Sequence, residues 1–217
     1  MTTSLRVSAF VSFALAVLLG AGVTGATGIR GQLGNPQNVQ RLMGRSDDVY
    51  VLFASFTQAS VVGRGELRDG GFFLTIPDTQ TLRLRPFEVC DGVRTSVPIR
   101  VYQTETILLY NNALNRAVGP LVQANTAVNP SKVARWMYSD KPATVAGQCT
   151  GLSTSYDLTL KAGWNAVLAV SATDSGKLVY TNLNEQLPYW LSRDFKFDKA
   201  RTTLPAAFFK AQRTLTR

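Results

Sequence analysis

Short apolar runs that end at glycine-marked turns dominate the sequence, and this pattern constrains the fold more than any other feature. Residues 154–161 alternate strictly, with Tyr156, Leu158 and Leu160 on one face and polar side chains on the other. A side-chain period of two is the pattern of a β-strand with one buried face. Several such runs separated by turns favour an all-β fold. We therefore expect an antiparallel β-sandwich of Greek-key or meander type with one or two short helices.

Individual strands can be placed from the same pattern. Residues 49–56 are apolar on both faces and suit a central strand. Residues 65–76 form two runs around Asp69-Gly70, which predicts a hairpin because glycine accepts the positive φ of a tight turn. Pro77 should end the second run, since proline has no N–H to give a neighbouring strand. Further strands are expected over residues 97–102, 105–110, 154–161, 164–170 and 177–180. Short turns join the last three of these strands, which predicts a three-stranded meander.

Helical patterns are scarce. Residues 36–43 predict one short helix, with Asn35 as its N-cap and Pro36 at its first position. Residues 204–213 predict a second helix. Residues 113–130 have no regular period, so we expect a long connection there.

The first residues have the organisation of a secretory signal. A start with one positive charge is followed by an uncharged apolar stretch and by small residues up to Ala26. This order predicts a signal peptide with an apolar helix, cleaved after Ala26. The alternative is a retained anchor, since residues 7–23 reach the short limit for a membrane-spanning helix. The expected organisation is a signal peptide over 1–26, a β-sandwich domain over 27–192 and a basic, aromatic C-terminal segment over 193–217.

The chain has two cysteines, Cys90 and Cys149. Export would place them in an oxidising compartment, so we expect one disulfide between them. Two buried free thiols are the alternative. The expected location is the periplasm, the outer membrane or the cell surface.

The chain of 217 residues contains no histidine. This excludes Ser-His-Asp and Cys-His catalytic sites and the histidine-dependent metal sites. Residues 63–68 come close to a Gly-x-Gly-x-x-Gly motif, but Arg68 replaces the last glycine and the run leads into a strand. We therefore expect no enzyme activity, no catalytic residue, no metal site and no cofactor.

Positive charge and aromatic side chains gather at the C-terminal end. Residues 193–217 hold seven basic and two acidic side chains. This combination suits an anionic surface, such as lipid headgroups, a glycan or an acidic protein. The alternative is a terminal strand and helix whose charges are only solvated. The candidate partner-binding residues are Trp190, Arg193, Phe195, Lys196, Phe197, Lys199, Arg201, Phe208, Phe209, Lys210 and Arg213.

The three tryptophans, Trp136, Trp164 and Trp190, allow two interpretations. Core packing is favoured, because large aromatic side chains dominate the burial of apolar surface. The alternative is an aromatic-lined ligand pocket.

Three segments carry a resemblance to a known class of proteins: residues 28–33, residues 68–77 and residues 156–165. The second has a Gly-x-Phe-x-Leu-x-Leu-Pro pattern in which Ile76 replaces the usual second leucine, and the third contains Gly163-Trp164-Asn165. These segments resemble small exported bacterial envelope proteins with a prealbumin-like (carboxypeptidase-regulatory-like) β-sandwich. The resemblance implies a non-catalytic surface role, including that of an accessory subunit.

Two functions follow as expectations. The first is a structural or accessory subunit of a bacterial surface-layer (S-layer) or outer-membrane protein assembly, with envelope subunits as partners. The second is a β-sandwich module that binds a small ligand or an anionic lipid or glycan surface. Nucleic acid is not an expected partner, because the charged residues are sparse and the chain is exported.

Overall fold

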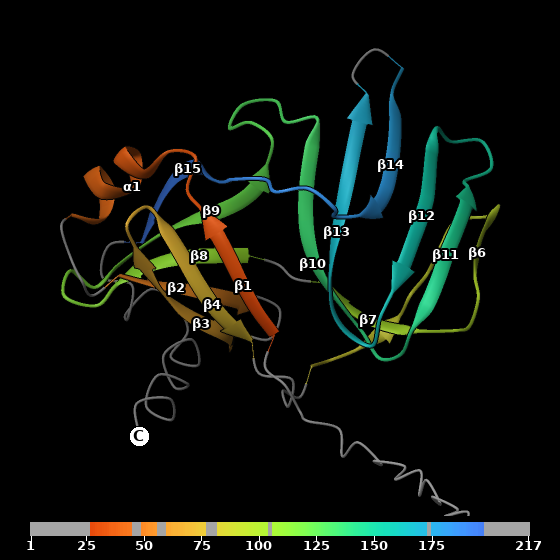
Figure 1. Ribbon diagram of the computed structural model, residues 1–217, viewed down its shortest axis with the longest axis horizontal. Coiled ribbons are helices and arrows are strands. Elements are labelled where there is room, and N and C mark those ends of the chain that lie inside the picture. The colour runs from red at the N-terminus through yellow and green to blue at the C-terminus, as the bar shows by residue number, and fades with distance from the viewer. Residues whose placement is uncertain are drawn as a thin grey trace, which may run out of the picture.

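A computed structural model describes residues 27–44, 49–55, 60–76, 82–103, 106–172 and 175–197. These residues form one short helix and fifteen strands, which confirms the expectation of a mostly-β protein (Figure 1). The predicted signal helix over 1–26 lies outside the described residues. The elements are β1 (Thr27–Gln32), α1 (Pro36–Met43), β2 (Val49–Ser55), β3 (Ser60–Arg68), β4 (Gly71–Ile76), β5 (Arg85–Pro86), β6 (Val93–Thr95), β7 (Arg100–Gln103), β8 (Thr106–Asn111), β9 (Arg116–Ala124), β10 (Lys132–Ser139), β11 (Ala143–Gln148), β12 (Thr154–Leu160), β13 (Gly163–Ala172), β14 (Lys177–Asn182) and β15 (Tyr189–Phe197).

The strands form one hydrogen-bonded sheet in the order β1-β4-β3-β2-β8-β9-β10-β13-β14-β12-β11-β6. Outside this path, β15 pairs with β9, and β7 pairs with β10 and β5. The pairs are antiparallel except for β12 and β14, so the sheet is mixed. In Figure 1 the first four strands, β8, β9 and β15 gather on the side of α1, and β10 to β14 stand on the other side.

The hairpin prediction is confirmed. β3 and β4 pair antiparallel, and Asp69 and Gly70 between them have φ angles of 50° and 73°. Two positive φ angles are the geometry that an Asp-Gly turn favours. β2 lies between β3 and β8, as its two apolar faces predict, and β4 ends at Ile76.

The predicted meander of three strands is wrong. β14 lies between β13 and β12 and runs parallel to β12. The chain crosses from β12 to β13 through Lys161 and Ala162, and the Asn165 side chain bonds both the amide and the carbonyl of Lys161. The Asn182 side chain at the end of β14 bonds the amide and carbonyl of Thr159 in the same way. These two asparagines replace backbone partners that a simple hairpin would have supplied.

The long connection expected over 113–130 is also wrong, because it contains the nine-residue strand β9. β9 is buried on both faces, so it shows no alternation, and it carries Gly119-Pro120, which is rare inside strands. Its neighbours are β8, β10 and β15. The sequence also gave no clear signal for β1, β5, β6, β10 and β11.

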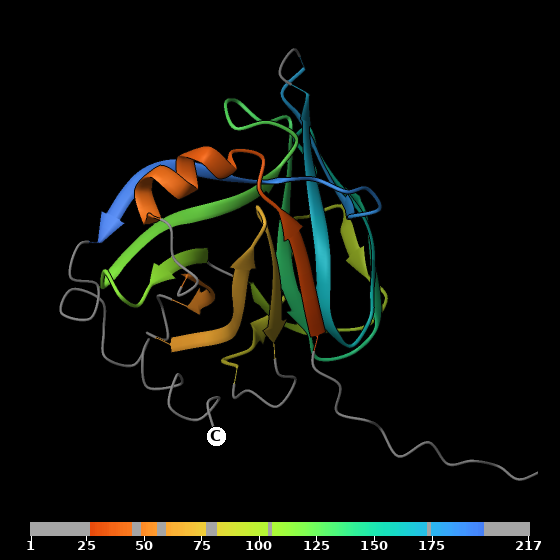
Figure 2. The same ribbon diagram turned by 60° about the vertical axis from the view of Figure 1, so that its left-hand side comes forward.

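The predicted helix over 36–43 is confirmed, with Val39, Leu42 and Met43 buried. Asn35 is the N-cap residue and Pro36 follows it, as predicted, but the Asn35 side chain makes no capping hydrogen bond. It instead bonds the amide and carbonyl of Leu191, so it ties the start of α1 to β15. Figure 2 shows α1 above β9, with β15 behind the helix in this view. The predicted helix over 204–213 lies outside the described residues.

Two large apolar clusters make up most of the core, and Trp164 belongs to the first of them. The first cluster includes residues of α1, β1, β2, β4, β8 and β9. The second cluster includes residues of β6, β7, β10, β11, β12 and β13. Trp164 of β13 is 1% exposed and meets the rings of Phe53 and Tyr138 edge to face at centroid distances of 5.3 and 5.5 Å. The core interpretation is therefore confirmed for Trp164.

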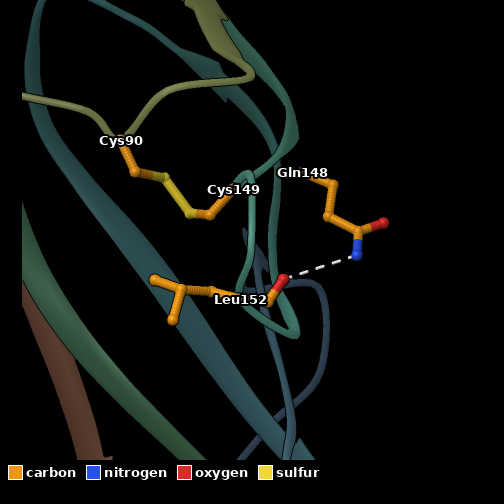
Figure 3. Close-up of a disulfide and its surroundings, with 4 residues drawn as sticks. All are labelled: Cys90, Gln148, Cys149 and Leu152. Carbon is orange, nitrogen blue, oxygen red and sulfur yellow. Dashed lines mark hydrogen bonds between the residues drawn. A yellow bond between two sulfur atoms is a disulfide. The ribbon is translucent and has the colours of Figure 1, made fainter.

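The predicted disulfide between Cys90 and Cys149 is present, with the two Cα atoms 5.4 Å apart (Figure 3). It joins the loop before β6 to the end of β11, and the Thr150 amide donates to the Asp91 carbonyl beside it. The Gln148 side chain donates to the Leu152 carbonyl at 3.4 Å across the following turn. The disulfide thus links the loop before β6, the last strand of the hydrogen-bonded path, to the end of β11. A disulfide is typical of proteins that fold in an oxidising compartment outside the cytoplasm.

Candidate functional site

The structure describes only part of the contact surface predicted at the C-terminal end. Arg193, Phe195, Lys196 and Phe197 belong to β15, and the last three stand opposite Gly119, Val118 and Ala117 of β9. The remaining predicted residues lie outside the described part of the chain: Lys199, Arg201, Phe208, Phe209, Lys210 and Arg213.

Trp190, the first residue of that predicted surface, is anchored within the fold. Its indole nitrogen donates to the Ala124 carbonyl at 2.9 Å. The ring lies so close to Gly34 that a Cβ atom there would fall 2.6 Å from three ring atoms. Gly34 therefore makes room for the indole, and Trp190 joins β15 to the segment between β1 and α1.

A cleft of about 1160 Å³ runs along β1. Gly28 to Gln32 all border it, although neighbouring side chains of a strand point to opposite faces. The cleft therefore borders the outer edge of β1 and also the exposed face of β1, β4 and β3. The facing wall consists of Gln123, Trp136, Ala166, Leu183 and residues 185–188, and β3 and β4 contribute Arg64, Gly65, Glu66, Arg68, Gly71, Phe72, Phe73 and Thr75.

β1 offers a free edge to this cleft. It is the end of the hydrogen-bonded path and pairs only with β4 among the described strands. The Leu33 amide donates to the Gly70 carbonyl on the β4 side, whereas the Gly34 amide donates to the Tyr189 carbonyl on the other side. Backbone groups of successive strand residues point to alternate edges. Even-numbered residues of β1 therefore point their amides and carbonyls toward the cleft.

A hydrogen-bonded chain of side chains fixes the facing wall. Tyr189 is buried and donates to Gln123 Oε1 at 2.9 Å, and it accepts from the Trp136 indole at 3.3 Å. Gln123 in turn donates to the Leu187 carbonyl at 3.3 Å. Burial raises the pKa of Tyr189 from 10.0 to about 12, because the phenolate would lose its hydration. The Tyr189 ring meets the ring of Phe72 in β4 edge to face at a centroid distance of 4.9 Å. This contact joins the β4 side of the cleft to the facing wall.

Positive charge is in excess around the cleft. Glu66 is bound by Arg68, and Glu185 is bound by Lys132 at 2.7 Å. Arg30 lies over the ring of Phe73 at 5.4 Å from the centroid, and Arg64 lies over Tyr50 at 3.7 Å. Both acidic side chains that border the cleft are thus paired, while these two arginines contact aromatic rings. The lining thus holds one more positive than negative side chain, Arg30, Arg64 and Arg68 against Glu66 and Glu185.

A second, smaller cavity of about 350 Å³ lies on the other side of Trp136 and Tyr189. Phe53, Ile107, Pro120 and Leu121 also border it. Its volume and its aromatic lining fall within the range of small-ligand pockets. Of the three tryptophans, Trp136 therefore borders a pocket of the size that the alternative interpretation requires.

Further observations concern the near-match to a nucleotide motif and the arrangement of possible metal ligands among the described residues. Gly63 and Gly65 of the near-match to a nucleotide motif lie on β3, where a Cβ at Gly65 would overlap the Phe73 carbonyl oxygen. These glycines serve the close approach of β3 and β4. Among the described residues, we find no cluster of three or more metal-ligating side chains. No helix in the same part of the chain has the length and apolarity needed to cross a membrane.

Comparisons with known proteins identify no relative. No protein-family model, no curated protein and no solved structure matches this chain.

The cleft along β1 was not predicted from the sequence. The only local signal was the alternation of Gly28, Arg30 and Gln32 with buried residues, which marks one polar face but not a free edge.

Proposed function

We propose that this protein is a non-catalytic, exported structural or accessory subunit of a bacterial cell-envelope protein assembly, either a surface layer or an outer-membrane complex. It works in the periplasm, in the outer membrane or at the cell surface, and its strands form a β-sandwich of the prealbumin-like kind. The open edge of β1, set in a cleft with a small excess of positive side chains, carries the proposal. Folded proteins usually protect such edges, so an open edge favours association with another chain.

The disulfide supports the location, since such bonds persist in oxidising compartments. The histidine-free sequence supports the absence of catalysis, since it excludes the commonest general base. The partners are other envelope protein subunits, and the basic C-terminal segment 193–217 adds affinity for an anionic membrane or glycan surface.

Cross-linking in intact cells, followed by detergent extraction of the envelope, tests this function. The chain should be recovered covalently joined to a small set of envelope proteins. An exported β-protein of similar charge, treated in parallel, gives the background. Recovery of the chain only as an uncross-linked, soluble monomer would contradict the proposal.

The cavity of about 350 Å³ supports a second function, that of a module for a small apolar or anionic ligand. Trp136 borders this cavity, so its fluorescence should change when a ligand enters. Native mass spectrometry of the protein isolated from its source would detect a retained ligand. A mass equal to that of the polypeptide alone would favour the subunit function.

A further inference from the structure

We propose that the outer edge of β1 accepts an extended, acidic segment of a partner envelope subunit as an additional β-strand. This inference rests on the proposed function and names both its contact site and the chemistry of its partner. Strand addition to an exposed edge is a general mode of peptide recognition, in which backbone hydrogen bonds give affinity and side-chain pockets give specificity.

The backbone groups needed for strand addition are in place. Gly28 and Arg30 are even-numbered residues of β1, so their amides and carbonyls point toward the cleft and away from β4. The backbone amides and carbonyls of Ile29 and Gly31 point toward β4 and already belong to the hydrogen-bonded ladder between β1 and β4. An added strand can therefore form hydrogen bonds to β1 without displacing any bond to β4.

The cleft limits what can reach this edge. The loop that contains Leu187 and Pro188 and the side chain of Trp136 face β1 across it. A whole second sheet would need an unobstructed edge, whereas a single extended chain needs only the width of one strand, about 4.8 Å. The volume of about 1160 Å³ exceeds the range of about 300–1,000 Å³ for pockets of small molecules. Its size and its shape along a strand both suit an extended peptide.

The side chains of the cleft define the partner's chemistry. Arg30 and Arg64 form no ion pair in the described part of the chain, whereas Glu66 and Glu185 are both neutralised by basic residues. A carboxylate on the added strand can reach Arg30, while Phe73, which is 50% exposed, offers apolar surface beside it. Arg30 and Phe73 are cross-strand partners and share one face of the sheet. Because strand side chains alternate, every second residue of the added strand points to that face, and acidic residues fit at those positions.

Two synthetic peptides test this site on the full chain. Both have blocked ends and alternate valine with a charged residue, which is glutamate in one peptide and lysine in the other. Residue-resolved amide exchange should show fast exchange at Gly28 and Arg30 in the free protein and slow exchange once the glutamate peptide binds. The lysine peptide should bind at least about tenfold more weakly, which corresponds to about 1.4 kcal/mol.

Paired variants separate the backbone contact from the charge. Arg30→Ala removes the guanidinium but keeps the amide, so it should weaken the glutamate peptide by about fivefold to tenfold. Arg30→Pro also removes the edge amide, at a position where an edge strand tolerates proline, and should weaken binding by about a further tenfold. A glutamate peptide that is N-methylated on the residues that bond to β1 should lose binding to the unaltered protein, whereas methylation on the alternate residues should have little effect. This arm needs no protein variant.

Several results would overturn the inference: no saturable binding of the glutamate peptide, binding without protection of Gly28 and Arg30, or equal binding of the two peptides. Slow exchange of these amides in the free, dilute protein would show that the chain covers its own edge. Slow exchange that appears only at high protein concentration would assign the edge to a second copy. If the peptide does not bind but the chain still cross-links to envelope proteins, the edge site falls and the proposed function stands. If the peptide binds but no envelope protein is cross-linked, the function falls.

Discussion

Replacing Tyr189 with phenylalanine tests the hydrogen-bonded wall that faces β1. The substitution keeps the ring, and with it the edge-to-face contact to Phe72, but removes the hydroxyl. Gln123 Oε1, in a side chain that is 9% exposed, then loses its donor from Tyr189. A buried polar atom that loses its partner costs about 1–3 kcal/mol. We expect the free energy of unfolding at pH 8 to fall by about 2 kcal/mol.

The same variant should change how stability depends on pH. In the folded protein burial raises the pKa of Tyr189 from 10.0 to about 12, so the folded state holds this proton more tightly than the unfolded state. This contribution is complete below pH 10 and is lost as the pH rises toward 12, and it amounts to about 3 kcal/mol. Tyr189→Phe has no proton to lose at this position. Its deficit of about 2 kcal/mol against the unaltered protein should therefore close between pH 10 and pH 12.

Urea unfolding followed by tryptophan fluorescence, at pH values from 8 to 11.5, measures both effects. Gln123→Leu and the double variant complete a mutant cycle, whose coupling energy should be about 0.5–1.5 kcal/mol. A deficit that is absent at pH 8, or one that stays constant up to pH 11.5, would refute the assigned burial and bonding of Tyr189.

Three other substitutions test separate parts of the structure. Replacing Cys90 and Cys149 with serine opens a loop of separation 59 and should lower the free energy of unfolding by about 4 kcal/mol; an unchanged urea midpoint would contradict this. Gly65→Ala should destabilise the fold by more than about 2 kcal/mol, because the added Cβ overlaps the backbone carbonyl of Phe73. Gly28→Ala should cost less than about 1 kcal/mol, because its Cβ meets only the end of the exposed Phe73 ring. Equal costs in thermal melts would contradict this packing of β1, β3 and β4. Trp164→Ala should cost about 3–5 kcal/mol and Trp164→Phe clearly less, since the buried indole nitrogen finds no hydrogen-bond acceptor among the described residues. Similar losses for the two variants in urea titrations would show that this nitrogen contributes to stability.

The parts of the fold that were predicted correctly depend on local chemistry. The Asp69-Gly70 turn, the helix that starts with Pro36, and the strand over 154–160 each follow from a few neighbouring residues. The disulfide followed from the number of cysteines and the expected compartment rather than from geometry. Agreement between local propensity and the final structure is strongest where a segment needs no distant partner to fix it.

The errors concern segments whose structure depends on distant parts of the chain. β9 is buried on both faces by strands from other regions, so alternation could not reveal it. β14 is inserted between β12 and β13 because the side chains of Asn165 and Asn182 satisfy the backbone at the crossing, and short turns alone suggested a meander. The cleft along β1 is likewise a product of topology, since β1 becomes an edge strand only when β4 pairs with its other side.

The intact mass of the chain, measured on protein isolated gently from its native envelope, tests the central claim most directly. The account predicts a polypeptide that begins after Ala26, with Cys90 and Cys149 oxidised, in a complex with at least one envelope protein. A full-length, reduced chain recovered alone from the cytosol would contradict it.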